Sequence, residues 1–249
     1  MKSKKREHYK RRENLKKGYS LVESLLSLSL FLLIVLSSLQ FFGFARRSFF
    51  KLKAAGEARE SALSALEKMK FDVLHTGFGL LEPVRLGFLE GIKENEKTLI
   101  LLSKDKDFRL LDELVPGQIK IPLDNTKGIK KKSEICIFDS KKGEVKRVFF
   151  LNRGNIVLSS PLNYRYSKEG SQLLLLKKIS LFFDEKKQII RRKVNNSPSQ
   201  PLLEEVISFD FSYIKTANIV NLSLVLKSEK EKKYEISVFP KNISLAFIH

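Results

Sequence analysis

The sequence predicts an α+β protein in which a long N-terminal helix, membrane-spanning in its first half, packs by its second half against an antiparallel β-sheet domain. The first observation is a run from Leu25 to Phe44 that has no charged residue and no proline. The second is the helical repeat of apolar residues that follows this run, and the third is a change to a two-residue repeat beyond Thr98. A chain of 249 residues is long enough for one anchored domain with a moderate core.

Residues 1–18 form a basic leader. Nine Lys or Arg residues stand against Glu7 and Glu13, which gives a net charge of +7, and such charge favours a cytoplasmic position. No apolar segment or small-residue cleavage site precedes Gly18, so the leader is not an ordinary secretory signal. Without the leader, 231 residues with a net charge of +12 would remain. This basic balance could favour anionic lipid, nucleic acid or acidic partners, or simply keep the protein soluble.

One helix is expected from Tyr19 to about Leu74, and residues 19–45 form its hydrophobic part. The run from Leu25 to Phe44 would extend for roughly 30 Å, about the thickness of one hydrocarbon core. Glu23 lies near the start of this run. Because a carboxylate at the centre of a bilayer costs about 2.5–3.5 kcal/mol on insertion scales, Glu23 needs a partner.

Residues 46–79 are expected to continue the helix with an amphipathic pattern and then to end it. The apolar stripe consists of Ala55, Ala58, Ala62, Leu66, Met69 and Val73. Gly43 and Gly56 are positions where the helix could bend or melt locally. The segment from His75 to Gly79 ends the helix, with Gly at the C-cap and His75 favourably placed at the negative end of the helix dipole.

Residues 80–249 are expected to form a β-rich head. The segment from Leu80 to Lys97 is predicted to be irregular, and Lys193–Gln200 is predicted to be an exposed loop. The last three strands alternate most clearly, with Ile207, Phe209, Phe211 and Tyr213 sharing one face of the first of them, which favours an antiparallel meander. The candidate strands are Thr98–Ser103, Ile119–Leu123, Glu134–Asp139, Glu144–Leu151, Asn155–Leu158, Leu173–Phe183 with a break near Lys177, Gln188–Val194, Glu205–Ile214, Asn218–Lys227 and Lys233–Pro240.

The segment Gly18-Tyr19-Ser20-Leu21-Val22-Glu23, between the basic leader and the apolar run, resembles the class III signal of type IV prepilins and type II secretion pseudopilins. The resemblance implies that a membrane peptidase cuts between Gly18 and Tyr19 and methylates the new amine of Tyr19. It also implies that Glu23 pairs with the N-terminal amine of a neighbouring subunit. Tyr19 departs from the Phe usual at this position, which puts the efficiency of methylation in doubt. The alternative is a plain signal-anchored helix in which Gly18 and Glu23 are incidental.

Three further segments resemble PilW-like and GspJ-like minor pilins, and a pilin-like fold is what this resemblance implies. They are Ala65–Gly79, where an acidic residue precedes a Gly-aromatic exit from the helix, Leu202–Tyr213, and Val238–Asn242. The expected function is that of a minor pilin at the tip or in the initiating complex of a type IV pilus. The alternatives are a GspJ-like minor pseudopilin of a type II secretion system, a DNA-uptake or adhesion module on the same scaffold, and an unprocessed membrane-anchored binding protein.

The resemblance also implies partners and a location. The expected partners are the prepilin peptidase, other major and minor pilins, an inner-membrane assembly platform and membrane lipid. The chain would cross the bacterial inner membrane once, with its N-terminus in the cytoplasm and its C-terminal domain outside, before assembly into a pilus or pseudopilus.

Residue patterns for catalysis or cofactors are not found, and we expect no enzyme, cofactor or metal site. Without the leader only His75 and His249 remain as histidines, and no nucleophile elbow or phosphate-binding loop occurs. Cys136, the sole cysteine, is expected to be buried in a strand. Basic runs are expected at solvated turns and strand ends, with DNA contact as the alternative. These runs are Lys130–Lys132, Lys141–Lys142, Lys177–Lys178, Arg191–Lys193 and Lys230–Lys233.

Overall fold

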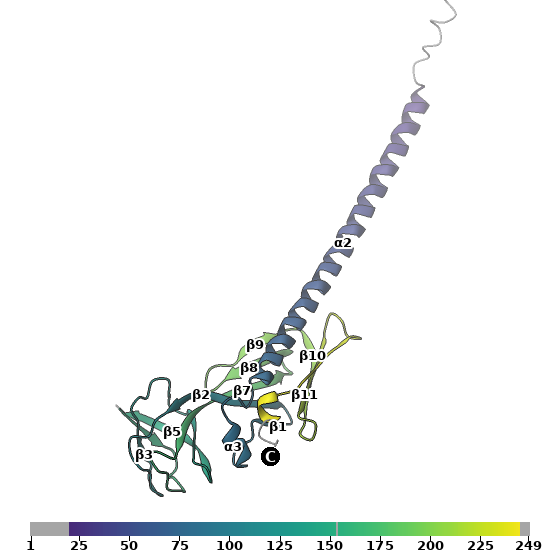
Figure 1. Cartoon of the computed structure of the whole chain (residues 1–249). Coiled ribbons are helices and arrows are strands. Elements are labelled where there is room, and N and C mark those ends of the chain that lie inside the picture. Colours follow the sequence, from purple (N-terminus) through teal and green to yellow (C-terminus); the bar gives the residue numbers. More distant parts are fainter. Residues whose placement is uncertain (1–19, 153, 245–249) are drawn as a thin grey trace, which may run out of the picture. The chain divides into compact units, whose positions relative to one another are not determined.

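The computed structural model describes residues 20–152 and 154–244 (Figure 1). The chain divides into two compact units, residues 1–56 and residues 57–249. The first unit contains most of α2 (Leu21–Leu74), and the second contains the rest of α2 and all the strands. The protein is therefore α+β, with one N-terminal apolar helix and a large antiparallel β domain, as the sequence predicts.

Helix α2 ends at the predicted residue. Its first turn is closed by the carbonyl of Ser20, which accepts hydrogen bonds from the backbone N–H groups of Glu23 and Ser24 at 2.9 and 3.0 Å. The helix continues unbroken through Gly43 and Gly56, the two positions where the sequence allows a bend or local melting. It stops at Leu74 because Gly77 takes a left-handed φ of 79° and donates its N–H to the carbonyl of Leu102, at 2.8 Å, in a strand of the head.

The second unit contains a nine-stranded sheet and a three-stranded sheet. In the larger sheet the strands follow the order β1-β2-β7-β4-β5-β6-β3, with β8 joined to β7 and β9 joined to β8. The elements are α3 (Leu81–Arg85), β1 (Ile92–Asn95), β2 (Thr98–Phe108), β3 (Lys120–Pro122), β4 (Glu134–Phe138), β5 (Gly143–Asn152), β6 (Asn155–Leu158), β7 (Gln172–Asp184), β8 (Ile189–Val194), β9 (Gln200–Leu203), β10 (Val206–Ile214), β11 (Ile219–Leu226), β12 (Lys233–Val238) and α4 (Lys241–Ser244).

Strand β7 connects the two halves of the larger sheet. Along one edge it pairs with β2 over nearly its whole length, and along the other its start pairs with β4 and its end with β8. The predicted break near Lys177 was wrong, since β7 is continuous there. The irregularity lies in the partner strand, as a bulge between Lys104 and Lys106 of β2.

The three-stranded sheet is the predicted antiparallel meander β10-β11-β12. The predicted inner face of β11 is confirmed, because Val220, Leu222, Leu224 and Leu226 are all buried. The prediction for Ile207 was wrong: its side chain is 40 % exposed, whereas Val206 is fully buried. A bulge between Val206 and Ser208 inserts Ile207 as an unpaired residue and turns it outward, while Phe209 keeps its inward position.

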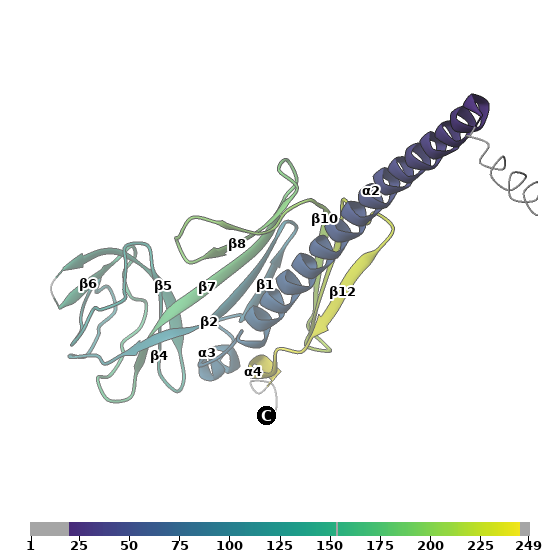
Figure 2. The same cartoon turned by 90° about the horizontal axis from the view of Figure 1, so that it is seen from above.

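Two main cores hold the second unit together. The first forms where the end of α2 lies between the β1-β2-β7-β8 region and the β10–β12 sheet, and it includes Met69, Leu101, Leu181 and Leu224 (Figure 2). The second fills the lobe built from β3 to β6 and the start of β7, around Tyr166. The predicted apolar stripe of α2 is confirmed from Ala62 to Val73, and Ala55 and Ala58 are half-buried.

Four short elements were missed. β1 and α3 lie within the segment predicted to be irregular, and β9 begins at Gln200, the last residue of the predicted loop. Helix α4 follows β12 directly. Strand β9 is an edge strand that contains Pro201, and β1 pairs only with β2, so both are stabilised by neighbours distant in sequence rather than by a local pattern.

Candidate functional site

Of the predicted processing and assembly residues, Glu23 lies within the described part of the chain. Gly18 and Tyr19 lie outside the described residues. Glu23 lies in the first turn of α2, where the partial positive charge of the helix N-terminus favours a carboxylate. Glu23 is the only charged residue between Ser20 and Ala45.

The helix around Glu23 presents apolar side chains on every side. Leu21, Val22 and Phe41 are 78 %, 70 % and 73 % exposed, and within this unit no large apolar side chain of the run is buried. The helix is long and apolar enough to span a membrane. Isolated soluble chains rarely expose so large an apolar surface, so this segment needs a covering of lipid or of other apolar helices.

Glu23 has no cation near it along its own helix. The next charged residue is Arg46, which lies about 35 Å further along the helix at the standard rise. Any pairing of the Glu23 carboxylate inside an apolar layer must therefore come from another chain or from the chain's own start. This geometry is suited to pairing with a cationic group.

In the second unit, a charge pair joins the end of α2 to β8. Arg192 donates from Nε to Oδ2 of Asp72 at 2.6 Å and from Nη2 to Oδ1 at 2.9 Å. The Asp72 side chain is 3 % exposed and the Arg192 side chain 15 %. The hydrogen bonds to Asp72 raise the pKa of the Arg192 guanidinium above its usual value. The pair fixes the helix end against the sheet.

A second buried polar network lies in the lobe around Tyr166. The Tyr166 hydroxyl donates to Oε1 of Glu144 at 3.1 Å, and the backbone N–H of Asn163 donates to the same carboxylate at 3.1 Å. Lys146 lies 2.8 Å from Glu144 and donates to the carbonyl of Pro161 at 2.6 Å. Burial, together with the Glu144 charge, raises the pKa of Tyr166 well above its usual value. Each polar group here has a partner, so the network stabilises the loop that precedes β7.

Cys136 and His75, which the sequence analysis names, have structural roles. Cys136 is fully buried in β4, as predicted, and burial raises the pKa of its thiol to about 12. His75 follows the last residue of α2, and its Nδ1 lies 2.9 Å from the carbonyl oxygen of Phe71, in agreement with the predicted helix-end role. Its ring centroid lies 4.0 Å from that of Phe71.

The basic runs are only partly at turns. Lys177 and Lys178 lie within β7, and Arg191 and Arg192 lie within β8. Arg191 pairs with Asp184, and Arg192 pairs with Asp72. The prediction that these two runs occupy turns or strand ends was therefore wrong. Lys131 does lie in a turn, with Nζ 5.6 Å from the centre of the Phe149 ring, which is 59 % exposed. This aromatic neighbour could not be predicted from the basic run itself, because Phe149 belongs to β5.

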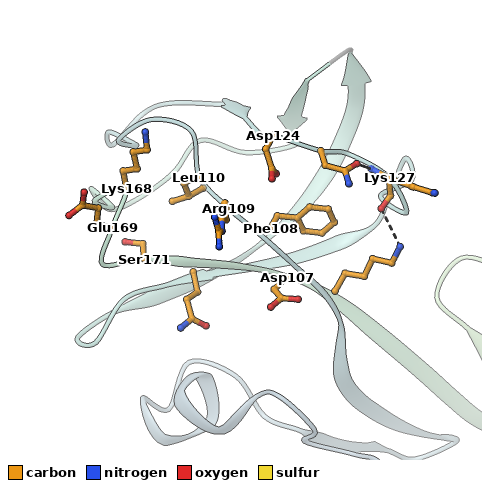
Figure 3. Close-up of a pocket in the computed structure, with 12 residues that line it drawn as sticks. Asp107, Phe108, Arg109, Leu110, Asp124, Lys127, Lys168, Glu169 and Ser171 are labelled. Atoms are coloured by element: carbon orange, nitrogen blue, oxygen red, sulfur yellow. Dashed lines mark hydrogen bonds between the residues drawn. The ribbon is translucent and has the colours of Figure 1, made fainter.

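One groove in the second unit has mixed charge. Its volume is about 760 Å³, and Figure 3 shows its lining from the end of β2, the loop after β3 and the loop before β7. Arg109, Lys127 and Lys168 are accompanied by Asp107, Asp124 and Glu169. Among the described residues, no group of three or more His, Cys, Asp or Glu side chains is placed to hold a metal ion.

Comparison with known proteins gives little further information. No family model and no curated protein matches the chain. Among solved structures, the tailspike of Acinetobacter baumannii bacteriophage AP22 is similar over 30 % of this chain, with 13 % identity and a TM-score of 0.27. The tailspike of Pseudomonas phage phi297 is similar over 30 % of this chain, with 9 % identity and a TM-score of 0.26. The matched region spans 15 % and 14 % of those chains, and TM-scores this low do not indicate a shared fold.

Proposed function

We propose that this chain is a minor pilin, a structural subunit that enters a type IV pilus after cleavage between Gly18 and Tyr19. The observation that supports this most is the isolated carboxylate of Glu23 at the start of an apolar helix that nothing in its own unit covers. Neither lipid tails nor apolar side chains can satisfy that carboxylate, whereas an N-terminal amine of a neighbouring subunit can. A second unit that packs antiparallel sheets on the end of the same helix agrees with a pilin-like fold.

In this proposal the chain first enters the inner membrane with its basic leader in the cytoplasm and its β domain outside. The prepilin peptidase then cuts after Gly18 and methylates the amine of Tyr19. Assembly moves the apolar helix from lipid into a bundle of helices from other subunits. Because both surroundings are apolar, this transfer gains little hydrophobic free energy, and the Glu23–amine pair supplies the axial register.

The same scaffold serves the minor pseudopilins of type II secretion systems, which remain the second candidate. Both machines use the same processing, so the chemistry at Gly18, Tyr19 and Glu23 is common to both proposals.

The test is the intact mass and N-terminal sequence of the protein extracted from membranes of cells that possess the peptidase. We expect a chain that begins at Tyr19 and carries one added methyl group. Cells without the peptidase provide the matched control and should yield the chain with its leader. An intact leader in cells with the active peptidase would contradict the proposal and leave a membrane-anchored domain as the explanation.

A further inference from the structure

The stretch of α2 that follows the apolar run combines basic and apolar side chains, and we call residues 46–53 the basic collar. It contains Arg46, Arg47, Lys51 and Lys53, and Phe49, Phe50 and Leu52 lie between them. No acidic residue occurs between Glu23 and Glu57. The collar therefore brings four positive charges into just over two helical turns.

The collar has no single apolar face. Successive residues turn by about 100° around a helix, which places the four cations within one arc of about 160°, with Phe50 among them and Phe49 and Leu52 outside it. Phe49, Phe50 and Leu52 are 62 %, 53 % and 74 % exposed, and all four basic residues are exposed. A helix that packs on a protein sheet shows a one-sided stripe, as α2 does from Ala62 to Val73, and the collar lacks one.

The positive charges of the collar are largely uncompensated. Among the described residues, Arg46, Arg47 and Lys51 form no ion pair, in contrast to Lys70 further along the helix, which pairs with Glu67 at 3.1 Å. The Arg46 guanidinium instead lies 5.7 Å from the centre of the Phe50 ring, and the Phe49 and Phe50 rings lie 5.9 Å apart. The surface thus offers positive charge beside aromatic rings.

We propose that the basic collar binds the headgroups of anionic phospholipids at the end of the membrane-spanning run. This inference rests on the proposed function to the extent that the helix must span a bilayer. The collar starts two residues after Phe44 and extends for about 10 Å, which matches a headgroup layer in scale. Aromatic rings favour that layer, and guanidinium groups bind phosphate oxygens in pairs. Lipids surround the helix on all sides, so they can contact both the cationic arc and the apolar side chains outside it.

The collar also gives the membrane-bound subunit an electrostatic contact that assembly must replace. When the helix leaves the bilayer, the headgroup phosphates no longer neutralise Arg46, Arg47 and Lys51. The collar therefore favours the membrane-bound state over the assembled one until another subunit supplies acidic groups.

The test compares lipid selectivity in reconstituted bilayers of phosphatidylcholine that contain spin-labelled phosphatidylglycerol or spin-labelled phosphatidylcholine. Electron paramagnetic resonance separates lipid that is slowed by contact with the protein from free lipid. The full chain is compared with the triple variant Arg46→Gln/Arg47→Gln/Lys51→Gln. The matched control is Lys130→Gln/Lys131→Gln/Lys132→Gln, which removes the same charge from a loop of the head.

We expect phosphatidylglycerol to be favoured over phosphatidylcholine by about threefold at the protein surface, since each basic residue near a membrane attracts anionic lipid. The preference should fall in the collar variant, where the basic leader and Lys53 still attract some phosphatidylglycerol, and it should be lost in high salt. It should persist at its full size in the control. If both lipids are slowed equally, or if the collar variant and the control lose the preference for phosphatidylglycerol equally, the inference is wrong. The helix would still span the bilayer in either case. If neither lipid is slowed, the helix does not span the bilayer, and the proposed function fails together with the inference.

Discussion

The buried ion pair of Asp72 and Arg192 gives a prediction about stability. The exposed fraction of each side chain decides how much unfolding free energy is lost when its partner is removed. Removal of one partner leaves the other charge buried and unpaired, which costs about 3–5 kcal/mol in buried pairs. In Arg192→Ala the remaining charge is Asp72, which is 3 % exposed, so we expect a loss of about 4–5 kcal/mol of unfolding free energy. In Asp72→Ala the remaining charge is Arg192, which is 15 % exposed and reaches water more easily, so we expect about 2–3 kcal/mol.

The double variant Asp72→Leu/Arg192→Leu separates loss of the pair from loss of packing. Replacement of a buried pair by apolar groups is often neutral, so the double variant should be more stable than Arg192→Ala. The cost of the matching variant Asp72→Ala/Arg192→Ala should also be well below the sum of the two single costs, and the difference measures the coupling of the pair.

The assay is urea unfolding of the full chain in detergent micelles, followed by near-ultraviolet circular dichroism of tyrosine. The second unit contains four of the six tyrosines, so the signal reports on the β domain rather than on the apolar helix. Costs below about 1 kcal/mol for both single variants would refute the reasoning, because they would match an exposed pair. Additive costs in Asp72→Ala/Arg192→Ala would refute it as well.

Three further predictions follow from the same structure. Glu23→Gln should be processed normally but be depleted from sheared filaments relative to the membrane fraction, as immunoblots would measure, and normal incorporation would contradict the assigned role of the carboxylate. Gly143→Ala should lower the unfolding free energy by about 1–3 kcal/mol, because its Cβ would overlap Cζ of Phe88 and lie 2.8 Å from Cβ of Phe138. The control Gly56→Ala, with nothing within 4 Å, should be neutral or slightly stabilising, and equal losses would argue against the clash. The unfolding free energy of Tyr166→Phe should fall less steeply with rising pH than that of the unchanged protein. The raised pKa of Tyr166 stabilises the fold fully below the unfolded pKa of about 10, and the contribution then falls by up to about 1.4 kcal/mol per pH unit as the pH rises. Unfolding at pH 8 to 11 gives the two slopes, and identical slopes would exclude this role.

The parts of the fold with a long local repeat were predictable from the sequence. The helix end at Leu74, the buried stripe from Ala62 to Val73 and the meander β10–β12 follow from apolar periodicity. Single-residue irregularities were not predictable, since the bulge at Ile207 keeps an alternating sequence and changes only the pairing. Short edge strands such as β9 form because β8 is already in place.

Among the polar residues, those with a local signal could be predicted from the sequence, and those whose partners are distant in sequence could not. Glu23 could be singled out because a lone carboxylate is conspicuous in an apolar run. The burial of Asp72 could not be predicted from the segment Ala65–Gly79 that contains it, because that burial depends on Arg192, which is 120 residues away. The partnership of Glu144 with Tyr166 likewise depends on a contact across 22 residues, and no local pattern identifies it.

In the proposed assembly, the apolar helix alone would not define how subunits are placed along a filament. A slip of one helical turn, about 5.4 Å, exchanges apolar contacts for other apolar contacts at little cost. The same slip separates Glu23 from the amine of its neighbour and leaves a carboxylate unpaired in an apolar layer. At about 2.5–3.5 kcal/mol, that penalty favours the paired register by roughly 100-fold per subunit. The position of one charge can therefore set the axial spacing of a bundle whose cohesion comes from the apolar residues around it.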